Sequence, residues 1–135
     1  MEPFGLQREA SMILRHVALI CSSEKNSDRF FKKLLGLKKS MPKTLPSSLS
    51  RAIFNVDGEL QIINYMNEDI HFEIFIADDS TRCVNPIAHV CIEIDDLETF
   101  LTKCVEVDVN VSQIPKGNRT LTFIRDYDGN LFEIK

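Results

Sequence analysis

Two histidines and two glutamates stand at matching positions of an internal repeat in this 135-residue chain. The segment that begins at His16 is similar to the one that begins at His89, because both open with His-Val and an apolar run. The segments around Glu73 and Glu133 match as well, because both read Phe-Glu-Ile. Imidazole and carboxylate groups together suit zinc, nickel, cobalt, manganese or ferrous iron. The four residues therefore predict a site for a divalent metal ion.

The repeat also predicts the elements that hold these residues. Each half reads as a strand, a helix and three further strands. We expect strands at 14–21, 52–56, 60–65 and 71–77 with a helix at 26–35, and then strands at 87–94, 109–113, 120–125 and 131–134 with a helix at 96–105. Asp57 and Gly58 are typical of a hairpin turn between two strands. Asn26 or Ser27 is the expected N-cap of the first helix.

Strand alternation places the four candidate ligands on one face of the predicted strands. The flanking residues on the other face are apolar and suited to packing against the helices. The expected fold class is α+β, with two tandem βαβββ modules that form a curved mixed sheet around a central cleft.

The first half of the repeat is longer than the second. The spacing between the two histidines exceeds that between Glu73 and Glu133 by 13 residues, which predicts an insertion in the first half. Its expected place is a segment rich in proline, serine and lysine. We therefore divide the chain into an N-terminal arm (1–12), a first module (13–80) with an inserted loop (40–51), a linker (81–86) and a second module (87–135), which together form one domain.

Composition excludes several classes of protein. The net charge of −4 argues against binding to a nucleic-acid backbone. No apolar run is long enough to span a membrane, and the first residues lack the apolar region of a secretory signal. Four cysteines, at positions 21, 83, 91 and 104, form no Cys-x-x-Cys pair. They are expected to be reduced and mostly buried, in a cytoplasmic protein.

Three segments resemble motifs of the vicinal oxygen chelate superfamily, which includes glyoxalase I, the bleomycin-resistance proteins and the extradiol dioxygenases. They are HVALI with FFKKLLGLK after it, HVCIEIDDLETF, and FIRDYDGNLFEIK at the C-terminus. The last is the most specific, and the resemblance covers about residues 13–135. Tyr127 stands between two aspartates where proline is usual, a difference that we expect to be neutral.

The resemblance implies that His16, Glu73, His89 and Glu133 are the four metal ligands of this family. Gln61 stays open as an alternative to Glu73, because GELQII resembles the ligand-bearing strand of some epimerases. The implied activity is that of a lyase or isomerase. It would act on a small molecule with vicinal oxygens through an enediolate-type intermediate, with Glu73 or Glu133 moving a proton.

Other functions stay open beside this one. A metal-free protein of the bleomycin-resistance type would bind an antibiotic-like molecule, but the chain has no tryptophan and two tyrosines to line a groove for a flat drug. A metal-dependent dioxygenase is a further alternative. Group transfer to fosfomycin is less favoured. The resemblance implies two histidines and one glutamate for relatives with that activity, whereas this chain has both Glu73 and Glu133.

The resemblance also implies a homodimer, since small members of the family usually pair modules between chains. In such a dimer His16 and Glu73 of one chain would complete a site with His89 and Glu133 of the other.

Overall fold

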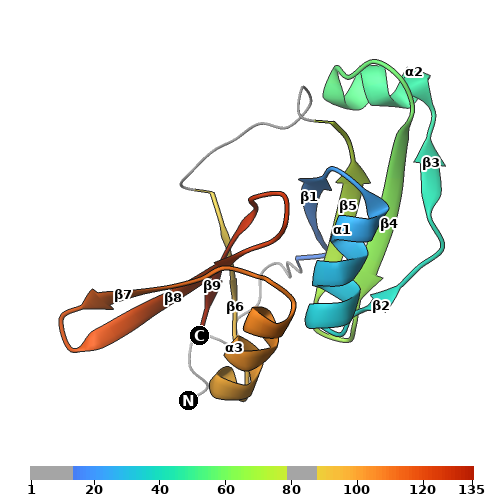
Figure 1. Cartoon of the computed structure of the whole chain (residues 1–135). Coiled ribbons are helices and arrows are strands. Elements are labelled where there is room, and N and C mark those ends of the chain that lie inside the picture. Colours follow the sequence, from blue (N-terminus) through green and yellow to red (C-terminus); the bar gives the residue numbers. More distant parts are fainter. Residues whose placement is uncertain (1–13, 79–87) are drawn as a thin grey trace, which may run out of the picture.

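The computed structural model describes residues 14–78 and 88–135, so the expected arm, the linker and Cys83 lie outside the described residues (Figure 1). The first module contains β1 (Val17–Cys21), α1 (Glu24–Ser27), η2 (Asp28–Leu34), β2 (Lys38–Lys39), β3 (Lys43–Leu45), α2 (Ser47–Leu49), η3 (Ser50–Phe54), β4 (Leu60–Met66) and β5 (His71–Ile76). The second contains β6 (Val90–Ile92), α3 (Leu97–Glu106), β7 (Val111–Lys116), β8 (Arg119–Arg125) and β9 (Leu131–Ile134). Within these two ranges no helix has the length and apolar character needed to cross a membrane.

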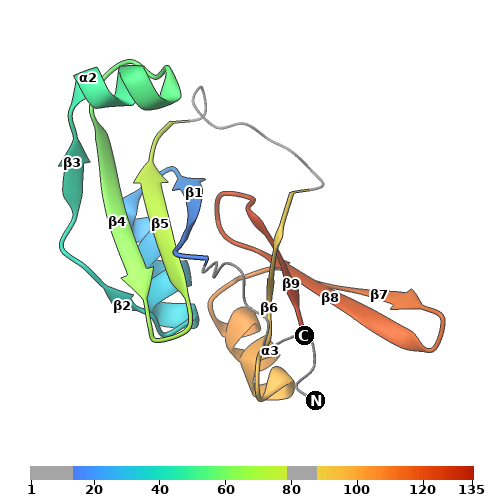
Figure 2. The same cartoon turned by 180° about the vertical axis from the view of Figure 1, so that it is seen from behind.

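The two modules repeat one topology. The first sheet has the order β1-β5-β4-β2, with β3 also paired to β4, and the second has the order β6-β9-β8-β7. The first and last strands of each module run parallel, and Val17 pairs with Phe72 just as Val90 pairs with Phe132. Figures 1 and 2 show a helix on one face of each sheet. The α+β class and the two βαβββ modules are confirmed, with each module forming its own mixed sheet.

The expected strand at 52–56 is wrong. Residues Ser50–Phe54 form η3, a π-helix that continues α2, and Asn55 ends it in the left-handed conformation with φ 58°. The physical reason lies in β4, which pairs with β5 along one edge and with β2 and β3 along the other. No edge of β4 is left for a further strand, so Asp57 and Gly58 do not join a hairpin.

The strand registers locate most of the extra length of the first module. Fourteen residues join Leu45 to Leu60, which pair with each other, whereas two residues join the equivalent pair Lys116 and Arg119. The extra residues therefore lie mainly between β3 and β4, somewhat later than the expected loop at 40–51. They fold into α2 and η3, and we call this segment, residues 46–59, the insertion.

The first helix begins earlier than expected. Ser23 is its N-cap, and the Ser23 Oγ accepts a hydrogen bond of 3.0 Å from the Asn26 backbone N–H. Ser27 lies inside the helix instead, fully buried, with its Oγ 2.8 Å from the Tyr65 hydroxyl. Gly36 follows the helix with φ 72°, a conformation that glycine adopts without strain.

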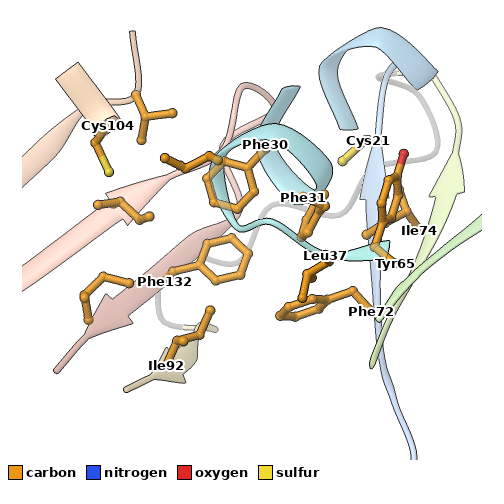
Figure 3. Close-up of a cluster of buried hydrophobic side chains, with 14 of the residues drawn as sticks. Cys21, Phe30, Phe31, Leu37, Tyr65, Phe72, Ile74, Ile92, Cys104 and Phe132 are labelled. Atoms are coloured by element: carbon orange, nitrogen blue, oxygen red, sulfur yellow. The ribbon is translucent and has the colours of Figure 1, made fainter. Parts of the chain in front are cut away.

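One cluster of buried side chains contains residues of both modules (Figure 3). Phe30 and Phe31 are neighbours in η2, and both are fully buried because the helix lies between the two sheets. The Phe30 ring lies 5.0 Å from that of Phe132 in β9, while the Phe31 ring lies 5.2 Å from that of Phe72 in β5. Helix η2 therefore joins the apolar faces of the two sheets.

The turn at 126–130 forms a second connection between the modules. The Asn130 Nδ2 donates to the backbone carbonyl of Ile20 in β1 at 3.0 Å and to the Asp126 Oδ2 at 2.7 Å. Asp126 is buried, and burial raises the pKa of its carboxyl above the usual range. The most specific motif of the sequence thus ties the end of the second module to the first strand of the first.

Tyr127, which stands where proline is usual, makes contacts that proline could not make. The Arg29 guanidinium of η2 lies 4.2 Å from the centre of the Tyr127 ring. The Tyr127 hydroxyl donates to the backbone carbonyl of Val107, and Arg29 donates to the same carbonyl at 3.2 Å. Proline has neither the hydroxyl nor the aromatic ring for these contacts. Tyr127 therefore strengthens the connection between the modules.

We expect Asn130→Ala to lower the free energy of unfolding by about 1–3 kcal/mol, because it removes the side-chain donor to the Ile20 carbonyl and one of the two side-chain donors to the buried Asp126 carboxylate. Urea denaturation followed by circular dichroism measures the change. Asn110→Ala is the matched control, since Asn110 is exposed, and it should change the value by less than about 0.5 kcal/mol. Equal values for the two variants would contradict the proposed role of Asn130.

Candidate metal site

His16 and Glu73 form the first candidate pair. His16 precedes β1 directly, and the parallel register of β1 and β5 sets Ala18 beside Glu73. The His16 Nε2 lies 3.5 Å from the Glu73 Oε1, and the two side chains are 42% and 26% exposed. The first pair therefore presents one nitrogen and one oxygen donor toward solvent on the face of the sheet that lies away from η2.

His89 and Glu133 form the second candidate pair, with nearly the same geometry. Cys91 pairs with Glu133 in the parallel register of β6 and β9. The His89 Nε2 lies 3.7 Å from the Glu133 Oε1, and the side chains are 39% and 17% exposed. The ring of Phe123 lies 6.2 Å from that of His89, at 75° between the planes. The repeat thus brings each histidine to its own module's glutamate, as its spacing indicates.

Each pair fits a metal ion in chemistry and in spacing. Two atoms bound to one ion at about 2.1 Å lie about 3.0–3.4 Å apart at octahedral to tetrahedral angles. The observed separations of 3.5 and 3.7 Å need only small side-chain shifts to reach that spacing. A pair supplies two donors, however, and protein metal sites of this chemistry use three or four.

The four predicted ligands do not meet in one chain. Across residues 14–78 and 88–135, no three side chains of histidine, cysteine, aspartate or glutamate gather closely enough to hold a metal ion. The pairs belong to different sheets, one built on β1 and β5 and the other on β6 and β9 (Figure 1). A single chain therefore presents two incomplete sets of donors.

Gln61, the alternative to Glu73, lies on the other face of the first sheet. It pairs with Ile76 across β4 and β5, whereas Glu73 pairs with Asn64. Neighbours across a ladder share a face, and successive residues alternate. Gln61 therefore faces the η2 side of the sheet, away from His16.

Asn64 is a neighbour of the first pair that the sequence analysis missed. The His71 Nε2 donates to the Asn64 Oδ1 at 2.6 Å, and the His71 ring lies 5.5 Å from the His16 ring. The sequence predicted the two strands, 60–65 and 71–77, but not their register. Their antiparallel register sets Asn64 opposite Glu73. Asn64 and His71 extend the polar surface around His16 and Glu73.

Two of the described cysteines, Cys21 and Cys104, are unsuited to act as thiolate nucleophiles. Cys21 and Cys104 are buried and unpaired, and burial raises the pKa of both thiols, to about 11 for Cys104. A thiol with so high a pKa stays protonated near neutral pH and is a poor nucleophile. Cys91 is exposed, so two of the three described cysteines are buried, in line with the expectation that the cysteines are mostly buried.

A cleft of about 830 Å³ lies between the modules. Its walls are the start of β1, the turn between β4 and β5, and β6 with the residues after it. His16 and His71 line one side, and Cys91 and Glu93 line the other. Of the four candidate ligands, His16 is the one that lines this cleft, so the cleft and the second pair are separate features of the chain.

Solved structures with the same fold include three that cover nearly the whole chain. A glyoxalase family protein from Enterococcus faecalis is 18% identical, with a TM-score of 0.69, and the match covers 90% of this chain and 95% of that one. A mutant of the fosfomycin resistance protein FosX from Listeria monocytogenes, solved with Mn(II) and 1S,2S-dihydroxypropylphosphonic acid, is 14% identical, with a TM-score of 0.70 and coverage of 93% and 92%. The trypanothione-dependent glyoxalase I of Leishmania major is 16% identical, with a TM-score of 0.62 and coverage of 92% and 86%.

These identities are low, so the structural matches establish the fold. No curated protein sequence matches the chain significantly. The family model described as the glyoxalase/bleomycin resistance protein/dioxygenase superfamily matches residues 13–134. The match spans both modules and includes both candidate pairs. The chain therefore belongs to the glyoxalase/bleomycin resistance protein/dioxygenase superfamily.

Proposed function

We propose that this protein is a divalent-metal-dependent lyase or isomerase that acts on a small molecule with two adjacent oxygens. The observation that carries the proposal is the repeated geometry of the two histidine–glutamate pairs, with nitrogen–oxygen separations of 3.5 and 3.7 Å. Packing and folding alone do not require a histidine and a glutamate at equivalent, partly exposed positions of both modules.

The proposed site is completed by a second copy of the chain. His16 and Glu73 of one subunit would join His89 and Glu133 of the partner subunit, and two-fold symmetry would create two identical sites of four donors each. The incomplete set in each module and the partial exposure of all four side chains support this arrangement.

The chemistry follows from the donor set. A divalent ion held there supplies Lewis acidity, which polarises adjacent substrate oxygens and increases the acidity of the neighbouring C–H bond. Glu133 is the candidate proton carrier of the second module and Glu73 that of the first, because a carboxylate can accept a proton from carbon and return it at another position. Phe123 pairs with Glu133 across β8 and β9, and the Glu133 side chain is 17% exposed.

Metal analysis of the untagged protein tests the donor set. We expect about one divalent ion per chain by elemental mass spectrometry, and a loss of most of it in His16→Ala and in Glu133→Ala. Glu98→Ala, at an exposed position of α3, is the matched control and should keep the metal. An absence of metal in the wild-type protein after loading with zinc, nickel, cobalt and manganese would overturn the proposal.

Mixed dimers distinguish a shared site from an intrachain one. One variant would carry His16→Ala and Glu73→Ala, and the other would carry His89→Ala and Glu133→Ala. Neither binds metal alone, but a mixed dimer purified through two different tags should regain about half of the wild-type metal content, because one of its two sites is intact. A mixed dimer without metal, formed from variants that fold and dimerise, would exclude the shared site.

A further inference from the structure

An apolar row lies next to the first pair on the same face of the first sheet. Ile20 and Ile62 flank Phe75 across the strands β1, β5 and β4. Glu73 lies two residues before Phe75 in β5, so the two side chains share a face and their Cα atoms lie about 7 Å apart. A molecule held at Glu73 would therefore reach this row with any group of a few carbon atoms.

The insertion packs on the same row. The ring of Phe54, in η3, lies 5.2 Å from that of Phe75 at 72° between the planes. Phe75 is 8% exposed, whereas Phe54 remains 48% exposed. Figure 2 shows α2 and the helix that continues it at the end of the first sheet, beside the upper ends of β4 and β5. Phe54 thus forms a half-open aromatic wall at one end of the face that carries the first pair.

Contacts within the insertion hold the chain on either side of Phe54. The Arg51 guanidinium bonds to the Asp57 carboxylate at 2.9 Å, on either side of Asn55, whose left-handed conformation ends η3. Ser50 is fully buried, and its Oγ donates to the Pro46 carbonyl at 3.3 Å. An aromatic ring that packs against Phe75 and stands on a segment held in this way is a suitable binding surface, because little conformational entropy is lost on binding.

The second module shows that the fold does not require this row. The position equivalent to Ile20 is Glu93, and the position equivalent to Phe75 is Lys135, in strands that share the same register. A two-residue turn replaces the insertion there. The apolar row and its aromatic wall are therefore specific to the module of the first pair.

We propose that the substrate carries an apolar group, of the size of a phenyl or branched alkyl group, beside its vicinal oxygens, and that Phe54 and Phe75 bind this group. The inference rests on the proposed function, since it places the oxygens at the metal ligands. Phe54 is then a specificity-determining residue, contributed by the insertion.

Two hydroxamic acids test the inference, because a hydroxamate binds a metal ion through two adjacent oxygens. Benzohydroxamate carries a phenyl group there, and acetohydroxamate carries a methyl group. Calorimetric titration of the manganese-loaded protein should give a dissociation constant at least about tenfold lower for benzohydroxamate, because the phenyl group loses contact with water. In Phe54→Ala the ratio should fall to about twofold, with the affinity for acetohydroxamate unchanged.

Two controls keep the test decisive. Val105→Ala, at an exposed position of α3, should keep the wild-type ratio. Phe54→Leu retains apolar area without the ring and should give an intermediate ratio, which covers the case that Phe54→Ala fails to fold.

The outcomes separate this inference from the proposed function. A failure to bind zinc, nickel, cobalt and manganese, measured before any hydroxamate is added, would reject the proposed function. Metal binding with equal affinity for the two hydroxamates would overturn the inference and leave the function standing. A wild-type ratio that Phe54→Ala does not alter would do the same. Dissociation of the dimer in Phe54→Ala, seen by sedimentation together with equal hydroxamate affinities, would assign Phe54 to the subunit interface instead.

Discussion

Glu133→Gln is expected to lower kcat by about 10²–10⁴-fold, the usual contribution of a positioned general acid or base. The substitution keeps the size of the side chain but removes its capacity to accept a proton from carbon. The exposed fraction of Glu133 is 17%, the lowest of the four candidate ligands, so the carboxylate proposed to move the proton is partly shielded from water. Steady-state kinetics on a panel of hemithioacetals, 2-oxo acyl thioesters and fosfomycin measures the loss.

Glu98→Gln is the matched control, since Glu98 is exposed in α3 and far from both pairs in the fold. It should retain wild-type kcat. A proton-exchange assay in D₂O adds a readout independent of product formation, because Glu133→Gln should stop the exchange of the substrate C–H while the far-ultraviolet circular dichroism stays unchanged. Full exchange in Glu133→Gln would assign the proton transfer to another group.

Phe132→Ala is expected to lower the free energy of unfolding by about 3–5 kcal/mol, the range for removing a buried phenylalanine. Phe132 is fully buried, and its ring lies within 6.2 Å of the rings of Phe30, Phe31 and Phe72. Those three residues belong to the first module and Phe132 to the second, so the cavity would open where the modules meet. Urea denaturation gives the change, and a loss of this size is a large part of the stability of a small domain.

Phe54→Ala serves as the comparison for the same chemical change at a half-exposed ring, with an expected loss of about 1 kcal/mol or less. Calorimetry of Phe132→Ala adds a second readout. A single transition is expected if the shared core couples the modules. Two separate transitions in the wild-type protein, or a loss below about 1 kcal/mol in Phe132→Ala, would contradict the role of Phe132 in joining the modules.

The sequence predicted the strands best where alternation and the repeat agreed. Strand β9 lies at Leu131–Ile134, as expected, and β5 and β4 differ from expectation by one residue. The strand at 52–56 failed because local residue preference carries no information about whether a partner edge is free, and β4 has none. The π-helical form of η2 and η3 also has no simple local pattern.

The candidate site could be predicted in its parts but not in its assembly. The repeat predicted the four residues at equivalent positions on one face of the sheet, and the parallel registers of β1 with β5 and of β6 with β9 then set each histidine beside its module's glutamate. Whether the two pairs meet depends on how whole modules pack, and the same residues serve either an intrachain or a shared site. The contribution of Tyr127 was missed for a similar reason, since its partner Arg29 is remote in sequence.

The position of the insertion has a consequence for the entropy of chain closure. The parallel pairing of Val17 with Phe72 closes a loop of 55 residues, whereas that of Val90 with Phe132 closes one of 42. Because closure entropy grows with the logarithm of loop length, this difference costs only about 0.2 kcal/mol. Segments of very different length can therefore be exchanged between β3 and β4 with almost no penalty from chain closure. The segment between β3 and β4 is therefore a place where a repeated βαβββ unit can change in length with very little loss of stability.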